Sequence, residues 1–325
     1  MVKNASSPLE NLENAWRVRE SLGLLDLKYP RRVFHGPGEG TSAFEHTLLI
    51  DRFLDYYWIT ARDAELRQSE INQVLKFLKS KNAKAIFLMQ RALGQKELSL
   101  HVLHGSEPEG DIIVPEGDLK FIIRFKGVHH PGLFLDHEPL RRWLVSCSKN
   151  KKVLNTFAYT GSLSVAAKRG GASHVTSLDL SNPAIEWAKN NWQLNGFFEE
   201  DATWIVDDYF DRMKRFKKKD EKFDCIILDP PSFSRSKKQT FSTKKDLPLL
   251  FSLALDCLES GGVLVASINS LDVSHIKILN DLKDASQKTK SQLKILKRIE
   301  QPESFLTPLA DESLRYLKGF IVLKG

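Results

Sequence analysis

The 325-residue chain has few cysteines and no long hydrophobic run. Cys147, Cys225 and Cys257 are widely separated, which argues against a disulfide framework and a paired-cysteine zinc site, and no metal is expected. No run of about 18 apolar residues occurs, so we expect no membrane span. Residues 1–7 lack the apolar stretch of a signal peptide. Together these absences predict a protein of the reducing cytoplasm.

Positive charge is in excess. Lysine and arginine number 48 against 41 acidic residues, which gives a net charge of +7 and a pI of about 9.1. This excess favours a polyanionic partner, because basic side chains displace counterions from phosphates. The densest basic run covers residues 212–219, and Lys237, Lys238, Lys244 and Lys245 follow it. A solvated surface loop explains the 212–219 run equally well, so both interpretations stay open.

Length and patterning indicate two domains, 1–126 and 127–325. Residues 1–30 predict a short helix at the edge of the fold. A small α+β domain is expected to follow, with strands at 33–35, 47–50, 56–60, 85–89 and 121–125, turns at 36–40 and 51–55, and a helix at 64–81. Residues 105–117 are rich in glycine, proline and acidic residues and are expected to form a connector.

From about residue 127 the pattern changes to strands that alternate with helices. The expected strands are 152–157, 174–180, 202–206, 223–228 and 262–268, and the expected helices are 162–169, 182–195 and 244–259. Two more strands are expected at 293–299 and 314–323. This alternation predicts an α/β fold, the doubly wound, Rossmann-like sheet of class I methyltransferases, whose last strand is antiparallel.

The segment after the first of these strands is a candidate ligand-binding turn. It reads Asn155-Thr156-Phe157-Ala158-Tyr159-Thr160-Gly161. Glycine lets the backbone approach a ligand, and the N–H groups at the start of the next helix favour an anionic end. A dinucleotide site would need G-x-G-x-x-G here, and because only Gly161 is present, NAD is disfavoured.

Acidic residues end the next three strands. Asp179, in Leu178-Asp179-Leu180-Ser181, is placed to accept hydrogen bonds from two ribose hydroxyls. Asp207 or Asp208 could accept one from an adenine amino group, and Asp229 ends the fourth strand. Any one of these acids could be a helix N-cap. The three together predict a site for S-adenosylmethionine.

The most specific motif is Asp229-Pro230-Pro231-Ser232-Phe233. Its paired prolines stiffen the loop and expose carbonyl oxygens. The Asp229 carboxylate and a proline carbonyl can hold the edge of a base, and Phe233 can stack on its face. The expected catalytic residues are therefore Asp229, Pro230, Pro231 and Phe233.

These motifs resemble the 23S ribosomal RNA methyltransferase family, which includes cytosine-C5 enzymes and the guanine-N7 domain of a bifunctional bacterial enzyme. The resemblance rests on segments 132–137 (Gly-Leu-Phe-Leu-Asp-His), 154–161 and 229–237, and covers about residues 30 to 325. Segments 32–40 and 50–53 are similar as well, but Thr41-Ser42-Ala43-Phe44 replaces the family's Gly-Leu-Pro-Gly. The PUA domain of the C5 relatives is not expected, because too few residues precede position 30.

The resemblance also implies site residues. It places Phe134 and Asp136 near the cofactor, Asp179 on the ribose, Asp208 on the adenine and Asp229 at the methyl-transfer site. The full set of expected cofactor-binding residues is Phe134, Leu135, Asp136, Asn155, Phe157, Tyr159, Thr160, Gly161, Asp179, Leu180, Ser181, Asp207, Asp208 and Asp229.

The methylated atom depends on the cysteines. Cytosine C5 requires a cysteine that first adds to the ring, and the C5 relatives carry it in a Thr-Cys-Ser segment after the fifth strand. Here that segment reads Val265-Ala266-Ser267-Ile268-Asn269-Ser270, whereas Cys225 and Cys257 fall at positions expected to pack in a strand and a helix. Guanine N7 has an available lone pair and needs chiefly alignment with the sulfonium methyl. N7 is therefore preferred, and an exocyclic amine of guanine or adenine stays open.

The expected function is S-adenosylmethionine-dependent methylation of large-subunit ribosomal RNA, at an unpaired or flipped base. Ribosomal RNA is the expected partner, and a homodimer is compatible with these residues. A small-molecule methyltransferase and a non-catalytic RNA-binding protein are the competing hypotheses. Turnover of a free nucleoside or amino acid would favour the first, and failure to bind S-adenosylmethionine would favour the second.

Overall fold

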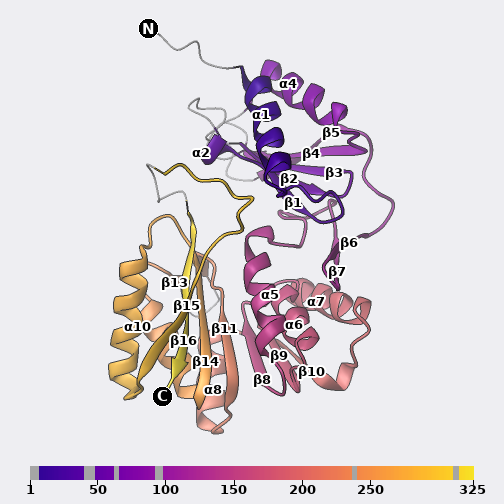
Figure 1. Ribbon diagram of the computed structural model, residues 1–325. Coiled ribbons are helices and arrows are strands. Elements are labelled where there is room, and N and C mark those ends of the chain that lie inside the picture. Colours follow the sequence, from indigo (N-terminus) through magenta and orange to yellow (C-terminus); the bar gives the residue numbers. More distant parts are fainter. Residues whose placement is uncertain (1–6, 40–47, 62–65, 92–97, 236–239, 310–314) are drawn as a thin grey trace. The chain divides into compact units, whose positions relative to one another are not determined.

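The computed structural model describes residues 7–39, 48–61, 66–91, 98–235, 240–309 and 315–325 (Figure 1). The chain forms two compact units, the first made of Met1–Leu135 and Pro302–Leu314, the second of Asp136–Gln301 and Arg315–Gly325. The units divide after Leu135, whereas the sequence pattern placed the boundary after residue 126. The return of residues 302–309 to the first unit is a long-range feature that local patterns do not reveal.

The first unit contains a five-stranded sheet in the order β1-β2-β3-β4-β5. The β3–β4 pair is parallel and the other pairs are antiparallel. Helices α1 and α4 pack together and share a hydrophobic core with this sheet. The elements are α1 (Pro8–Ser21), β1 (Arg31–His35), α2 (Gly36–Glu39), β2 (Leu48–Phe53), β3 (Tyr56–Ala61), α4 (Gln68–Ser80), β4 (Ala85–Arg91), β5 (Leu98–His104) and the hairpin of β6 (Ile112–Glu116) and β7 (Leu119–Ile123).

Several expectations for this unit differ from the structure. Residues 36–39 form the short helix α2 instead of a turn, and β2 continues to Phe53, so that the turn is confined to Leu54 and Asp55. The segment 105–117, expected to be a connector, contains β6, whose residues pair antiparallel with those of β7. The sequence pattern did not predict β5. The expected helix residues 64 and 65 and the expected strand residue 47 lie outside the described residues.

The second unit contains a seven-stranded sheet in the order β10-β9-β8-β11-β14-β16-β15. The first five strands are parallel, and β16 pairs antiparallel with both β14 and β15. This topology confirms the predicted doubly wound sheet with an antiparallel end. The strands are β8 (Lys152–Thr156), β9 (His174–Asp179), β10 (Ala202–Val206), β11 (Phe223–Leu228), β14 (Leu258–Asn269), β15 (Leu293–Ile299) and β16 (Leu317–Lys324), beside the small hairpin of β12 (Phe233–Arg235) and β13 (Thr240–Ser242).

Helices cover both faces of this sheet (Figure 1). On one face lie α5 (Glu138–Cys147), α6 (Ser162–Arg169) and α7 (Asn182–Leu194); on the other lie α8 (Tyr209–Lys218), α9 (Leu247–Cys257) and α10 (His275–Thr289). The described residues also include two short 3-10 helices, η1 (Leu135–His137) and η2 (Glu199–Asp201). No described helix is both long and apolar enough to cross a membrane.

The sequence pattern did not predict α5, α8 or α10. Helix α8 carries most of the basic run 212–219, so the surface-loop interpretation of this run is wrong. The run is helical because Phe210, Met213 and Phe216 recur every three residues and are buried against the core. Its lysines and arginines occupy the remaining, solvent-facing positions.

The strand order reverses between β8 and β11, because the chain leaves β8 toward β9 and β10 on one side and later returns on the other. Ligands of doubly wound sheets bind at the carboxyl ends of the strands at such a point. The β8–α6 loop and the Asp229 loop both begin there.

Candidate active site

The loop between β8 and α6 has a strained backbone. Phe157 and Tyr159 have positive φ angles of 55° and 48°, which non-glycine residues rarely adopt. Such conformations cost about 1–3 kcal/mol each and cluster at ligand sites. Gly161 also has a positive φ, of 73°, and a Cβ there would lie 2.7 Å from the Cβ of Ala188 in α7. Glycine is therefore required at this position.

Helix α6 starts immediately after this loop with no side-chain cap on its first turn. The first N–H groups of a helix have no partner within the helix, so they are available to water or to a ligand. The positive end of the helix dipole adds to their preference for an anion. The loop and the helix start together suit the carboxylate of an amino-acid-like ligand.

Asp179 ends β9 beside this loop. Its Oδ2 accepts the Tyr159 N–H at 2.8 Å, and its Oδ1 accepts the Ser181 N–H at 2.8 Å. Burial raises the pKa of the Asp179 carboxyl, and the bonds from these N–H groups offset only part of that rise. Each oxygen keeps capacity for a further hydrogen bond, so the carboxylate can also accept bonds from ligand hydroxyls.

The two acids after β10 have partners within the protein. Asp207 Oδ2 accepts bonds from Arg212 at 2.9 Å and Arg215 at 2.8 Å. Asp208 caps α8, because its Oδ1 accepts the Asp211 N–H at 3.2 Å. The contact of either acid with adenine stays a prediction.

Two apolar side chains at the same strand ends are exposed. Leu180, after β9, is 52% exposed, and Val206, the last residue of β10, is 46% exposed. Exposed apolar groups beside polar ones are typical of small-molecule sites. The sequence prediction of the site included Leu180 but missed Val206. The position of Val206, an apolar residue directly before the Asp207-Asp208 pair, could have indicated it.

The Asp229 loop leaves β11 next to the β8–α6 loop. Pro230 is buried, whereas Pro231 is exposed and the Phe233 ring is 62% exposed. The loop is anchored at Ser232, whose hydroxyl donates to the Asn269 carbonyl at the end of β14 at 2.6 Å. Its conformation therefore depends on the end of β14. Residues 236 and 237 of the family motif, and Lys237 and Lys238 of the basic set, lie outside the described residues.

His137 lies buried between two carboxylates. Its Nδ1 is 3.2 Å from Asp136 Oδ1, and its Nε2 is 3.3 Å from Asp229 Oδ1 and 3.0 Å from Ser267 Oγ. Burial alone would lower the pKa of His137, but the charges and hydrogen bonds of Asp229 and Asp136 outweigh it and raise the pKa to about 10. At neutral pH this residue is therefore an imidazolium that neutralises the buried side of Asp229.

The contact with His137 determines which part of the Asp229 side chain is exposed. Its Oδ1 is fully buried, whereas the side chain as a whole is 21% exposed, so the exposed part lies away from His137. Sequence reasoning quoted His137 within the segment 132–137 but gave it no role. The available signal was its position beside Asp136 in a segment shared with the family.

Lys318 of β16 is a second buried cation near this site. Its ammonium group donates to the Ser270 carbonyl at 3.0 Å, just after β14, and burial lowers its pKa. This bond stabilises the end of β14, where the Asn269 carbonyl accepts the hydrogen bond from Ser232. Sequence reasoning did not single out Lys318.

The other predicted residues of the second unit have structural contacts. Asn155 donates to Ser164 at 2.8 Å within the core, and the Thr160 carbonyl accepts from Asn191 at 2.8 Å. Ser181 caps α7. The Phe157 ring packs against that of Tyr209, with centroids 5.1 Å apart. These contacts stabilise the walls of the site, and their roles toward a cofactor stay predictions.

Phe134 and Leu135 belong to the first unit. The Phe134 ring stacks on His130 with centroids 4.1 Å apart, and Leu135 is buried. Their contact with a cofactor stays a prediction, as does that of Asp136, which the structure shows paired with His137.

None of the three cysteines is activated. Burial raises the pKa of Cys225, in β11, to about 12 and that of Cys257, at the end of α9, to about 11. Burial also raises the pKa of Cys147. All three are protonated near neutral pH, whereas a nucleophilic cysteine needs a lowered pKa. In the part of the chain that the structure describes, no group of three or more His, Cys, Asp or Glu side chains could hold a metal ion.

The chain is similar to known methyltransferases. The family model of S-adenosylmethionine-dependent methyltransferases matches residues 31–317. The chain is 28% identical to ribosomal RNA large subunit methyltransferase I of Vibrio parahaemolyticus, over 96% of this chain and 79% of the relative. It is 31% identical to a candidate ribosomal RNA large subunit methyltransferase of Bacillus subtilis, over 90% of this chain and 74% of the relative.

A solved structure shows the same fold. It is a candidate S-adenosylmethionine-dependent methyltransferase from Streptococcus mutans, with a TM-score of 0.85 and 23% identity, over 99% of this chain and 83% of that one. The family match spans both units and includes the β8–α6 loop, Asp179 and the Asp229 loop. The chain therefore belongs to the S-adenosylmethionine-dependent methyltransferase family, and S-adenosylmethionine is its cofactor.

Proposed function

We propose that the protein methylates large-subunit ribosomal RNA, at N7 of a guanine. The observation that carries this proposal is the Asp229 loop, which contains a partly exposed carboxylate, paired on its buried side with His137, and, four residues later, the exposed ring of Phe233. A carboxylate can accept hydrogen bonds from the edge of a base while an aromatic ring stacks on its face. The names of the Vibrio and Bacillus relatives support ribosomal RNA as the substrate class. A ribosomal substrate in turn implies a cytoplasmic location.

The strand ends supply the groups that S-adenosylmethionine needs. The start of α6 would hold its carboxylate, Asp179 its ribose hydroxyls, and Leu180 and Val206 the faces of its adenine. When bound, the cofactor supplies an electrophilic methyl group on a sulfonium. The protein's contribution is alignment of the base with that methyl group, because binding in a reactive geometry removes much of the barrier.

The cysteines support a nitrogen as the acceptor. A cysteine that attacks cytosine must be a thiolate near the base, and the raised pKa values of Cys147, Cys225 and Cys257 disfavour this. Guanine N7 has a lone pair and no proton to lose, so it needs neither a nucleophile nor a strong base. The proposed role of Asp229 is accordingly to hold the base.

Substitution of Asp179 by alanine is expected to weaken S-adenosylmethionine binding at least tenfold, by about 1.4 kcal/mol or more. The change removes the acceptor for the ribose hydroxyls and also releases the Tyr159 N–H that fixes the loop. Isothermal titration calorimetry measures the dissociation constant. Asp201→Ala is the control, because this acid pairs with Lys168 and is given no role in the site. Unchanged affinity of Asp179→Ala would remove the ribose assignment.

The proposed substrate class is tested by incubating the protein with radiolabelled S-adenosylmethionine and ribosomal RNA that lacks modifications. We expect label in the large-subunit RNA, at a level proportional to enzyme. Absence of label from RNA, in a protein that binds the cofactor, would contradict the proposal. Transfer to a free nucleoside or amino acid instead would make the protein a small-molecule methyltransferase.

A further inference from the structure

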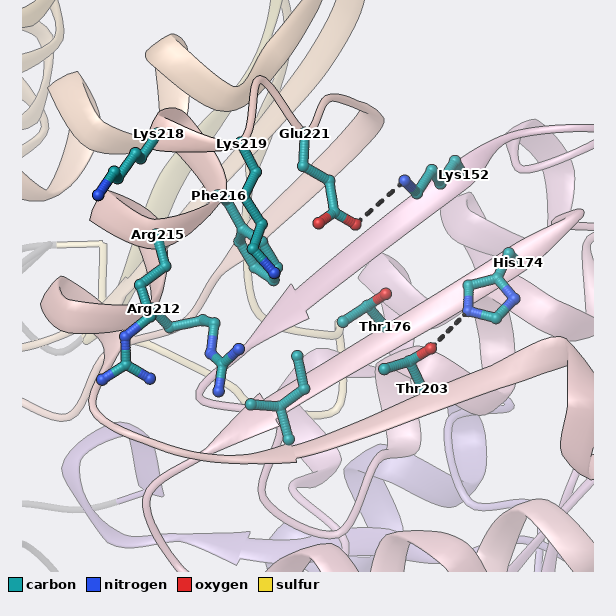
Figure 2. A pocket seen from close by; sticks show the side chains of 11 residues that line it. Lys152, His174, Thr176, Thr203, Arg212, Arg215, Phe216, Lys218, Lys219 and Glu221 are labelled. Atoms are coloured by element: carbon teal, nitrogen blue, oxygen red, sulfur yellow. Dashed lines mark hydrogen bonds and ion pairs between the residues drawn. The ribbon is translucent and has the colours of Figure 1, made fainter.

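A cationic cavity lies within the second unit, apart from the Asp229 loop (Figure 2). Its volume is about 680 Å³, and it lies between α8 and the sheet. Arg212, Arg215, Lys218 and Lys219 reach it from α8 and its C-cap, and Lys152 reaches it from the start of β8. Such a concentration of cations on one wall is not needed to stabilise a helix, since like charges repel.

The negative charges at the cavity do not balance these cations. Glu221 is the one carboxylate in its lining, and it pairs with Lys152 at 3.2 Å. Asp207 neutralises part of the charge of Arg212 and Arg215. Lys218 and Lys219 are both exposed. A net positive charge therefore remains, and it favours an anionic ligand.

The neutral part of the lining suits a nucleic acid. Thr203 and His174 hydrogen-bond to each other at 2.8 Å and add polar groups to the lining (Figure 2). Ile205 and Phe216 add apolar surface. Burial and the nearby charge of Lys152 lower the pKa of His174, so the ring is neutral near pH 7. A cationic groove with apolar surface is what single-stranded nucleic acids bind.

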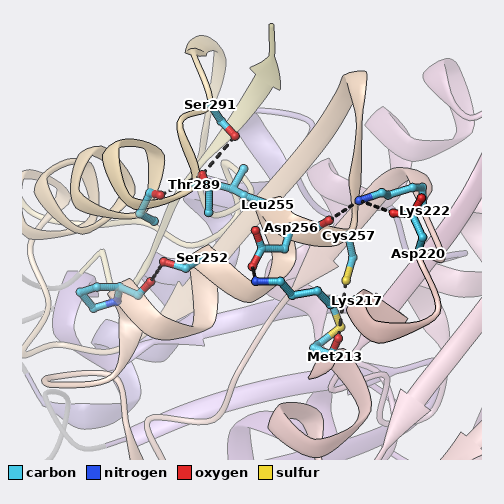
Figure 3. A network of polar contacts seen from close by, with 12 residues as sticks. Met213, Lys217, Asp220, Lys222, Ser252, Leu255, Asp256, Cys257, Thr289 and Ser291 are labelled. Carbon is cyan, nitrogen blue, oxygen red and sulfur yellow. Dashed lines mark hydrogen bonds and ion pairs between the residues drawn. The ribbon is translucent and has the colours of Figure 1, made fainter. Parts of the chain in front are cut away.

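The lysines at the end of α8 divide between this cavity and the neighbouring helix α9. Lys217 is not in the lining but pairs with Asp256 of α9 at 2.8 Å, and Lys222 donates to the Asp256 carbonyl at 2.7 Å (Figure 3). These contacts, with the bond from Cys257 to the Met213 carbonyl, fix α8 on α9. The helix is thus anchored on one side, which directs Arg215, Lys218 and Lys219 to the cavity.

We propose that this cavity binds the phosphate backbone of the substrate RNA at nucleotides that flank the methylated base. The inference rests on the proposed function. The lining extends from Ile205, near the end of β10, to Lys152 and His174, which are the first residues of their strands, whereas Asp229 follows the last residue of β11. The distance from Asp229 is therefore greatest at Lys152 and His174. A parallel strand of five or six residues spans about 16–20 Å at about 3.3 Å per residue. One RNA chain that reaches both places must extend beyond the target nucleotide, so the cavity contributes to affinity and not to chemistry.

The test is a double variant, Lys218→Gln/Lys219→Gln, assayed by filter binding to unmodified large-subunit RNA over a range of salt concentrations. Each lost phosphate contact lowers the slope of log affinity against log salt by about 0.7 for a single strand, so we expect a loss of about 1.4. RNA affinity at about 0.1 M salt should fall roughly tenfold, since each contact counts more at low salt. Cofactor affinity and the rate at saturating RNA should stay at wild-type values.

Two matched controls make the same type of change elsewhere. Lys283→Gln/Lys288→Gln removes two exposed lysines from α10, and Lys217→Gln removes a lysine of the same run that faces Asp256. Both should keep the wild-type salt slope. If the α10 variant loses as much slope as the α8 variant, general surface charge explains binding and the inference is overturned. Displacement of the RNA by guanosine monophosphate at an equal concentration would also overturn the inference. The cavity would then bind a single nucleotide as well as it binds an RNA chain.

Failure of the proposed function gives a different result. If wild-type protein binds RNA and the α8 variant weakens that binding, but no RNA is labelled by S-adenosylmethionine, the cavity assignment stands and the methylation proposal fails. If RNA is labelled and the α8 variant keeps the wild-type affinity and slope, the methylation proposal stands and the cavity assignment fails.

Discussion

Asp229→Ala is expected to lower the rate of methyl transfer at saturating RNA and cofactor about 100-fold or more, while the dissociation constant of S-adenosylmethionine changes little. The side chain lies at the end of β11 with its inner oxygen against His137 and its remaining surface available to the base. Removal of one preorganised polar group at a reacting centre typically costs a factor of about 10²–10³ in rate. Single-turnover transfer from labelled cofactor measures this rate, and calorimetry measures cofactor binding.

Two controls define the role of Asp229. Asp229→Asn keeps the shape of the side chain but loses its charge, so an intermediate rate is expected if the carboxylate accepts bonds from the base. Asp272→Ala removes an exposed acid that pairs with Lys244 and should leave the rate unchanged. A parallel loss of cofactor affinity and rate in Asp229→Ala would assign this residue to cofactor binding instead.

Substitution of His137 is expected to have the largest effect on stability. His137→Ala leaves the facing oxygens of Asp136 and Asp229 buried without their cation. Removal of one partner of a buried ion pair costs about 3–5 kcal/mol, because the remaining charge stays desolvated. Urea denaturation should therefore show a strongly lowered midpoint. Ser267→Ala, which removes only the hydroxyl 3.0 Å from Nε2, should cost much less, about 1 kcal/mol.

The same ion pair gives a pH dependence of defined sign. The pKa of His137 is raised from 6.5 to about 10 in the folded protein. The proton is therefore bound more tightly in the folded state, and its stabilisation is complete below pH 6.5 and is lost as the pH rises toward 10. We expect the stability difference between wild type and His137→Ala to shrink between pH 7 and pH 10. A constant difference over this interval would show that His137 is not a buried cation.

The parallel strands of the second unit could be predicted from sequence because all of them except the edge strand β10 are largely buried. Such strands are continuous apolar runs, as in Phe223–Leu228, and helices with clear start signals separate them. The acidic residues proposed for the site were recognisable for the same reason, since each follows an apolar run at the carboxyl end of its strand. Asp179 and Asp229 lie at those ends in the structure.

The elements that were missed depend on tertiary contacts. Helix α8 has a strongly charged sequence and is held by the apolar residues of one narrow face, of which Phe210 and Met213 are part. The ion pairs of Asp207 with Arg212 and Arg215 form because these arginines lie on that helix. They could therefore not be predicted without predicting the helix. His137 and Asp229 are 92 residues apart in the chain, as their numbers show, and only the fold brings them together.

Nucleoside analysis of labelled product RNA tests the central claim most directly. Unmodified ribosomal RNA is incubated with radiolabelled S-adenosylmethionine and the wild-type protein, digested to nucleosides and separated by chromatography. The account predicts that the label elutes as 7-methylguanosine. Label in 5-methylcytidine would contradict it, because that product requires a nucleophilic cysteine, and none of Cys147, Cys225 and Cys257 has the lowered pKa of one.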